Sequence, residues 1–146
     1  MKKLYMCIGA SGSGKSTLAN KTAEQLRKEH GCLVNIWSTD KYFVDVHGNY
    51  KFDPSKLGYY HKCNQKGVET SMSCNVSFII VDNTNLTKKE RKPYTDLAEK
   101  YGYEVEYLYP ETPWANDAEE LTKRNTHGVP LESIKRMLAR MERHDE

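Results

Sequence analysis

The hydrophobic residues of this chain follow two periods that alternate along the sequence. Apolar residues in the pattern of β-strands occupy four segments, at residues 3–8, 34–37, 76–81 and 103–109. The segments between them carry apolar residues at helical spacing, as in Ala19, Ala23 and Leu26. Strands that alternate with helices are typical of α/β proteins, in which helices cover both faces of a parallel sheet. We therefore expect a parallel sheet of about four to five strands flanked by helices.

Five helices are expected, and turn or capping residues mark most of their ends. They are a helix that ends near His30–Gly31, one over roughly residues 55–72, one that stops at Gly102, one over about residues 114–125 and one that starts near Pro130. Thr87 and Glu90 form a capping box at the start of the third helix. No internal repeat or low-complexity segment occurs, so residues 1–146 are expected to form one domain.

Composition narrows the classes of protein to which the chain can belong. It has 146 residues, with 22 Lys and Arg against 20 Asp and Glu. This nearly even balance argues against a protein that coats long stretches of nucleic acid, but it allows a site for one end or a few phosphates. No apolar run approaches the ~18 residues of a membrane-spanning helix. We expect no membrane partner and a cytoplasmic location.

The four cysteines lie far apart and form no CxxC pair; they are Cys7, Cys32, Cys63 and Cys74. Metal clusters and redox motifs need close spacing, so the sequence supports neither. A disulfide framework stays open as an alternative, although four scattered thiols fit a reducing compartment better.

The segment after the first strand carries the clearest chemical signal. Residues 9–17, Gly-Ala-Ser-Gly-Ser-Gly-Lys-Ser-Thr, fit the pattern GxxxxGK[ST] in full. The glycines let the backbone curl so that successive N–H groups converge on a phosphate, and the following helix adds its positive dipole end. A glycine-rich turn that binds nothing is the alternative. The full match between an apolar strand and an amphipathic helix favours a P-loop.

This loop is expected to bind ATP or GTP together with Mg²⁺. The expected nucleotide-binding residues are Gly12, Ser13, Gly14, Lys15, Ser16 and Thr17. Lys15 should reach the β- and γ-phosphates, and the hydroxyl of Ser16 should bind the metal.

Two carboxylates follow apolar strands at the edge of the sheet where the ligands of α/β proteins bind. Asp40 follows the second strand and Asp82 the third. One such carboxylate can orient Mg²⁺ and another can accept the proton of an attacking hydroxyl, and we expect Asp82 to serve the metal. The alternatives are a helix or turn cap for Asp40 and a turn role for Asp82, because Asp-Asn-Thr-Asn is good turn chemistry.

Basic residues near the C-terminal end provide a candidate lid in roughly residues 114–130. Arg124 ends a helix beside a glycine-containing break. A mobile arginine there can offset the charge of a transferred phosphoryl group, and a contact with the negative end of the helix is the alternative.

Other polar residues are expected to have structural roles. Arg136, Arg140 and Arg143 should line a solvated side of the last helix. His127 is expected to be a structural turn residue. The same interpretation applies to three neighbours on the second helix, His61, Asn64 and Gln65.

Several motifs together resemble the 5′-hydroxyl polynucleotide kinase domain of T-even bacteriophages. They are the opening MKK…IGASGSGKST, Asp40 after the second strand, Asn-Thr-Asn at 83–85, Lys-Tyr-Gly at 100–102 and Lys-Arg-Asn at 123–125. The resemblance covers nearly the whole chain. Residues 82–94 and 124–129 look closer still to related kinase-like domains of eukaryotic and viral proteins.

This resemblance implies a P-loop kinase with a C-terminal lid, with ATP and Mg²⁺ as ligands and a nucleic-acid 5′ end as acceptor, in nucleic-acid repair. Lys15 and Ser16 would bind Mg-ATP, Asp40 would be the general base for the 5′-hydroxyl, and Arg124 would belong to the lid. The chain departs from the phage pattern at Phe43, where the phage kinase has an arginine, and a second lid arginine has no clear equivalent near Gly128.

Three functions are therefore open. The leading hypothesis is an ATP-dependent kinase for the 5′-hydroxyl of DNA or RNA. A kinase for a small molecule, such as a nucleoside or sugar alcohol, would use the same residues. A nucleotide-binding module that recognises nucleic-acid ends with little catalysis is the third, and Phe43 favours it. Two other activities are not expected, because neither the HxT or HxS motifs of paired-histidine cyclic phosphodiesterases nor the KxDG motif of ligases occurs.

Overall fold

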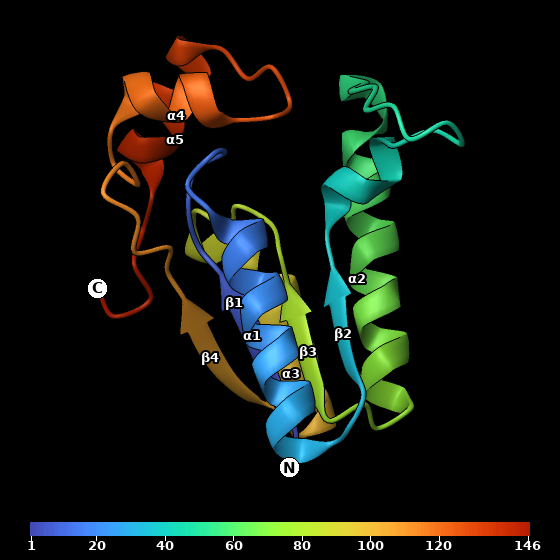
Figure 1. Ribbon diagram of the computed structural model, residues 1–146. Helices are drawn as coiled ribbons and strands as arrows, with labels where there is room; N and C mark the ends of the chain where they lie inside the picture. The colour runs from blue at the N-terminus through green and yellow to red at the C-terminus, as the bar shows by residue number, and fades with distance from the viewer.

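Four parallel strands form the central sheet of the computed structural model, which describes residues 1–146 (Figure 1). The strands are β1 (Lys3–Cys7), β2 (Val34–Trp37), β3 (Phe78–Val81) and β4 (Glu104–Leu108), in the order β2-β3-β1-β4. Every pairing is parallel, so the carboxyl ends of all four strands lie at one edge. This is the predicted α/β fold of P-loop NTPases, with four strands in the sheet.

Five α-helices and two short 3₁₀-helices surround this sheet. They are α1 (Lys15–His30), α2 (Leu57–Ser73), α3 (Lys88–Tyr101), α4 (Ala118–Arg124) and α5 (Leu131–Arg140), with η1 (Thr39–Phe43) and η2 (Pro54–Lys56) between β2 and α2. In Figure 1, α1 covers one face of the sheet and α3 lies behind it, while α4 and α5 lie beyond the carboxyl ends of the strands. None of these helices is both long enough and apolar enough to cross a membrane.

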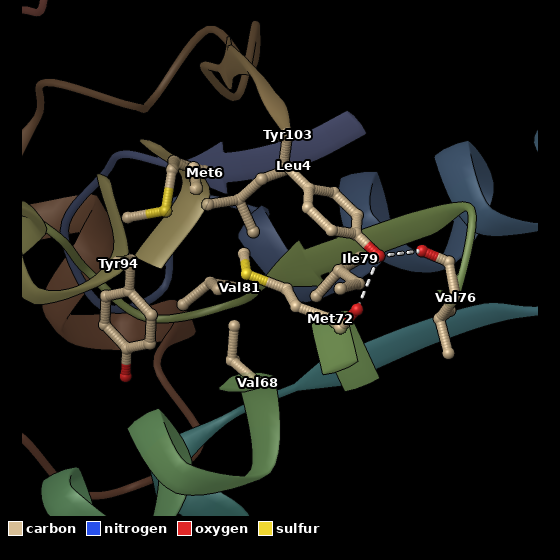
Figure 2. Packing of buried hydrophobic residues seen from close by; sticks show 10 residues of the cluster. Leu4, Met6, Val68, Met72, Val76, Ile79, Val81, Tyr94 and Tyr103 are labelled. Carbon is tan, nitrogen blue, oxygen red and sulfur yellow. Dashed lines mark hydrogen bonds between the residues drawn. The ribbon is translucent and has the colours of Figure 1, made fainter. Parts of the chain in front are cut away.

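The alternation of side chains along β1 builds a separate core on each face of the sheet. Leu4 and Met6 pack with residues of α2 and α3, whereas Tyr5 and Cys7 pack with residues of α1. Figure 2 shows the first core, in which the buried Tyr103 hydroxyl donates to the carbonyl oxygen of Val76 at 2.6 Å. The polar group of this ring is therefore satisfied inside an apolar cluster.

A third, smaller core joins α4 and α5 to the loop that follows β1. Ala10 of that loop is fully buried against Leu121 of α4 and Ile134 of α5. The two helices therefore pack beside the segment predicted to bind phosphate rather than over a face of the sheet.

Most of the expected boundaries agree with the structure, and the largest difference concerns the helix expected over residues 114–125. This helix, α4, begins only at Ala118, because the Asp117 carboxylate accepts a hydrogen bond from the Glu120 N–H at 3.2 Å and so caps the helix. Arg143 also lies beyond the end of α5, with its guanidinium 4.1 Å from the ring centroid of Tyr109. The expectation that it lines the last helix is wrong. All four cysteines are unpaired.

We predict that Gly67→Ala in α2 lowers the free energy of unfolding by about 1–3 kcal/mol, measured by urea denaturation. A Cβ atom at Gly67 would lie 2.3 Å from the Trp37 ring of β2, and that ring is held by a hydrogen bond from its Nε1 to Ser71 Oγ at 3.0 Å. Gly58→Ala in the same helix is the matched control, because no atom lies within 4 Å of the new methyl group. Equal stability of the two variants would contradict this account of the α2–β2 contact.

Candidate functional site

The loop between β1 and α1 has the backbone geometry of an anion-binding site. Gly12 and Gly14 adopt positive φ values of 84° and 101°, and Gly14 caps α1. The backbone N–H groups of Gly12, Gly14, Lys15, Ser16 and Thr17 donate to no backbone carbonyl. Unpaired N–H groups in a glycine-rich turn at the start of a helix are suited to bind phosphate oxygens.

Ser13 adds a further unpaired group to this loop. Ser13 is fully buried, and its hydroxyl has no hydrogen-bond partner within the protein. A side chain on Gly9 would approach this hydroxyl to 2.7 Å, so the glycine leaves room for it. A buried polar group without a partner costs stability, and its presence fits a loop that is completed by a ligand.

Lys15 and Ser16 place a cation and a hydroxyl beside the loop. The Lys15 ammonium donates to the Ala10 carbonyl at 3.1 Å, across the curl of the loop. The Ser16 hydroxyl donates to Asp82 Oδ2 at 2.7 Å. Burial lowers the pKa of Lys15, while the negative charges of Asp82 and Asp40 oppose this shift. These groups fit a nucleotide with Mg²⁺: the lysine faces phosphate charge, and a hydroxyl and a carboxylate converge as oxygen ligands.

The turn after β3 is fixed by hydrogen bonds from the Asn-Thr-Asn segment. Asn85 adopts a left-handed φ of 46°, and its side chain donates to the Cys7 carbonyl at the end of β1, at 2.8 Å. Arg91, buried in α3, donates to the carbonyl of Asn85 at 2.7 Å. The N–H of Gly9 donates to the Thr84 carbonyl at 3.1 Å. This turn therefore joins β3 to the phosphate loop and holds Asp82 beside Ser16.

Asp40 lies in η1, with about half of its side chain exposed. Its Oδ2 is 3.5 Å from Nε2 of His127, which belongs to the segment between α4 and α5. The His127 ring also stacks on Tyr50, with ring centroids 3.9 Å apart. Burial raises the pKa of Tyr50 to about 12, and the Asp40 charge adds to the shift. The structure thus brings the candidate base together with two rings that sequence reasoning did not connect to it.

Polar residues of α2 support the same strand end from the other side. The N–H of Thr39 donates to Asn83 Oδ1 at 2.8 Å, and the Thr39 hydroxyl lies 3.2 Å from Nδ1 of His61. Burial lowers the pKa of His61, although the charges of Glu90 and Asp40 oppose this. Asn64 is buried and donates to the Tyr94 hydroxyl at 2.9 Å. The side chains of His61 and Asn64 therefore both contact neighbouring elements, while the Oδ1 of Asn64 has no hydrogen-bond partner within the protein.

Arg124 lies at the end of α4 and contacts other residues of the candidate lid. Its Nε donates to Glu120 Oε1 at 2.8 Å, and its guanidinium lies 3.5 Å from the centroid of the Trp114 ring. The same indole donates from Nε1 to the Gly12 carbonyl at 3.1 Å. Trp114 therefore links Arg124 to the phosphate loop.

The backbone of α4 is in close contact with the phosphate loop. A Cβ atom at Gly12 would lie 2.8 Å from the Leu121 carbonyl oxygen and 2.9 Å from the Asn125 nitrogen. The Asn125 side chain organises the turn that follows, because it donates to the Val129 carbonyl at 3.1 Å and accepts from the Val129 N–H at 2.8 Å. No other residue than glycine fits at position 12 without movement of α4.

Taken together, these residues have the arrangement of a nucleotide-binding site of the P-loop type. The loop amides, Lys15, Ser16 and Asp82 lie on one side of it, and Asp40 with His127 lies at the neighbouring strand end. No group of three or more histidine, cysteine, aspartate or glutamate side chains gathers as a metal site. Ser16 and Asp82 supply two neighbouring oxygen atoms, which suits a metal that takes its other ligands from a nucleotide and water, as Mg²⁺ commonly does.

Comparison with known sequences identifies the class of domain. A family model described as an AAA domain matches residues 4–144. Human NEDD4-binding protein 2 is 41% identical over 140 residues, which cover 96% of this chain and 8% of that protein. The 2′,3′-cyclic-nucleotide 3′-phosphodiesterase of Rattus norvegicus is 26% identical over 149 residues, which cover 97% of this chain and 32% of that protein. The chain thus spans a third or less of these curated relatives.

Solved structures share the fold. A chain of the Pnkp1/Rnl/Hen1 RNA repair complex superposes with a TM-score of 0.71 at 22% identity, covering 95% of this chain and 43% of that chain. The APS kinase CysC of Mycobacterium tuberculosis, in complex with AMPPNP and APS, gives a TM-score of 0.67 at 16% identity, covering 99% and 84%. Chaetomium thermophilum Kti12, in complex with ADP-AlF3, gives 0.63 at 16% identity, covering 96% and 80%. At these identities the similarity shows a kinase-like P-loop fold.

We predict that Ser16→Ala weakens the binding of Mg-ATP by at least about tenfold but leaves the affinity for ATP without metal unchanged. The variant loses the hydroxyl that faces Asp82, while the loop amides and Lys15 remain. Calorimetric titration with and without Mg²⁺ measures both affinities. Ser16→Thr keeps the hydroxyl and is the matched control. An unaltered Mg²⁺ dependence in Ser16→Ala would remove this residue from the metal site.

Proposed function

This chain belongs to the AAA domain family of P-loop proteins, and from this premise we propose that it is an ATP-dependent kinase for the 5′-hydroxyl of a polynucleotide. Residues 1–146 act as one kinase domain, in which roughly residues 114–130 form the lid. The observation that carries the proposal is the position of Asp40. Its carboxylate is about half exposed, lies beside the phosphate site and, unlike that of Asp82, accepts no hydrogen bond from Ser16. A nucleotide site with a second, accessible carboxylate has a group available for the acceptor.

The residues divide into a donor side and an acceptor side. On the donor side, the loop amides and Lys15 bind the β- and γ-phosphates and offset their charge, with Ser16 and Asp82 as the oxygen ligands of Mg²⁺. The bound metal would neutralise charge on the phosphates. On the acceptor side, Asp40 orients the 5′-hydroxyl and takes its proton.

The reaction is a single displacement at phosphorus. The acceptor oxygen forms a bond to the γ-phosphorus while the bond from that phosphorus to the β–γ bridging oxygen breaks, and ADP leaves. The hydroxyl proton passes to Asp40. Arg124, released from Glu120 and Trp114, turns toward the transferred group and stabilises its charge.

A small-molecule kinase is the second candidate, and one observation favours it. APS kinase CysC, solved in complex with APS, shares the fold with a TM-score of 0.67, close to the 0.71 of the chain from the RNA repair complex. A module with little catalysis is the third, because Phe43 is buried where the resembling phage kinase has an arginine. In this case nucleotide binding would occur without transfer.

The deciding experiment is transfer of label from γ-labelled ATP to 5′-hydroxyl oligonucleotides of DNA and RNA. We expect labelled 5′ ends that are removed by phosphatase, and little competition from nucleosides or APS at equal concentration. Transfer that a small acceptor suppresses would favour the second candidate. Tight ATP binding without transfer to any acceptor would favour the third.

We predict that Asp40→Ala lowers kcat by about 10²- to 10⁴-fold while its affinity for ATP stays unchanged, because general-base catalysis contributes rate in this range. Steady-state kinetics with an oligonucleotide acceptor and calorimetry with ATP measure the two quantities. Asp53→Asn is the control, since Asp53 only accepts hydrogen bonds from Ser55 and asparagine can do the same. Normal turnover of Asp40→Ala would show that another group takes the proton.

A further inference from the structure

A connected series of aromatic rings runs from Asp40 to the surface at the start of α2. We call it the aromatic face, and its residues are Tyr42, Phe43, Tyr50, Phe52, Tyr59 and Tyr60. Phe43 is at its centre, with ring centroids 5.1 Å from Phe52 and 4.8 Å from Tyr60. Tyr50 lies at the end nearest the phosphate site, stacked on His127.

The outer rings of this face are open to solvent to an unusual degree. Phe52 is 51% exposed and Tyr59 is 67% exposed, whereas Phe43 beneath them is only 4% exposed. Val44 and Val46 of the same segment are exposed as well, so residues 44–59 hold four of the six large apolar side chains that the protein exposes. A gathering of this kind on a domain that is otherwise polar indicates a binding surface.

Positive charge accompanies the exposed rings. Residues 41–66 contain five lysines against two aspartates and no glutamate, so this segment is more positive than the whole chain, whose formal net charge is +2. The lysines are Lys41, Lys51, Lys56, Lys62 and Lys66. Only Lys51 forms an ion pair, with Asp45 at 3.3 Å. Lys56, Lys62 and Lys66 are exposed and unpaired, so three ammonium groups on η2 and α2 are available to a polyanion. Lys41 is exposed too, but it lines a hollow with residues of α1 and β2.

We propose that the aromatic face binds the unpaired nucleotides that follow the 5′ end of a single-stranded polynucleotide. Bases stack on Phe52 and Tyr59, and the surrounding lysines bind the backbone phosphates. Exposed aromatic rings among basic residues are the usual means of holding a single strand without sequence preference. A duplex would contribute only its phosphates, because its bases are already stacked and paired. The inference rests on the proposed function, since it takes Asp40 as the position of the terminal hydroxyl.

The position of the face gives the strand a direction. Lys41 directly follows Asp40, and Tyr50 contacts the His127 ring that lies 3.5 Å from the Asp40 carboxylate. A terminal nucleotide at Asp40 would therefore be followed by nucleotides that pass Tyr50 and reach the exposed rings. A single nucleoside would occupy only the first of these positions. The face thus favours an oligonucleotide over a small acceptor.

The test is fluorescence anisotropy of the full chain with an eight-nucleotide single strand, labelled at its 3′ end, in the presence of a non-hydrolysable ATP analogue. We expect the double variant Phe52→Ala/Tyr59→Ala to weaken the Kd for the strand by at least about 5-fold, which is the low end of the range for the loss of one stacked base. Both side chains are more than half exposed, so the variant should stay folded, which thermal unfolding checks. Leu33→Ala is the matched control, because Leu33 is 64% exposed and lies before the amino end of β2, whereas the aromatic face follows the carboxyl end of that strand.

Three outcomes would overturn the proposal. They are a double variant that binds the strand as the unmodified protein does, an equal loss in Leu33→Ala, and an eight-base-pair duplex that binds as tightly as the single strand. Poly-glutamate that competes as well as the strand at equal charge would also overturn it, because the surface would then select charge without stacking and would suit an acidic protein.

Binding and turnover separate this inference from the proposed function. Retained, ring-dependent binding of the strand without any phosphoryl transfer would contradict the kinase assignment and leave the aromatic face in place. Transfer to the oligonucleotide with an unaltered KM in the double variant would contradict the role of the aromatic face and leave the kinase assignment in place. A control for charge is Lys62→Ala against Lys89→Ala on α3, of which only the first should raise the Kd and reduce its dependence on salt.

Discussion

The site depends on how the chain leaves β3. Asn85 adopts a left-handed backbone conformation, and its side chain donates to the last carbonyl of β1. The Arg91 guanidinium donates to the carbonyl of Asn85. Parallel strands bring their carboxyl ends to one edge, but they do not by themselves fix the side chains there. The hydrogen bonds of this turn supply that order, because they keep Asp82 within 2.7 Å of Ser16.

A second level of order comes from packing at the same edge. Leu121 and Ile134 bury Ala10, so the helices after β4 rest on the phosphate loop and not on a face of the sheet. The segment that joins these helices carries His127 to Asp40. The phosphate loop and Asp40 are therefore connected through α4 and α5, although Asp40 and His127 are 87 positions apart in the chain.

Much of this architecture could be predicted from residue patterns. The parts that could not be predicted depend on competing local signals or on contacts that form only in the folded chain. The period of the apolar residues gave the strands and helices, and the glycine-rich motif gave the anion site, because both signals are local in sequence. The late start of α4 was missed because Asp117 competes as a cap with the apolar pattern before it. The contact of His127 with Asp40 joins distant segments, so only the folded chain reveals it. Arg91 bonds to Asn85 only six positions away, but its burial depends on packing that a local pattern does not show. The run of Tyr and Phe in residues 42–60, set among lysines, is a local signal in the sequence that belongs to no motif.

The absence of a side chain at Gly12 has a consequence for observing this protein at work. Since the loop backbone touches the main chain of α4 with no intervening atoms, a change in the curl of the loop must displace that helix. A spectroscopic reporter at an exposed position of α4, such as Lys123, would then register the arrival and departure of nucleotide without lying in its path. The indole of Trp114, bonded to the Gly12 carbonyl, offers an intrinsic emitter at the same junction.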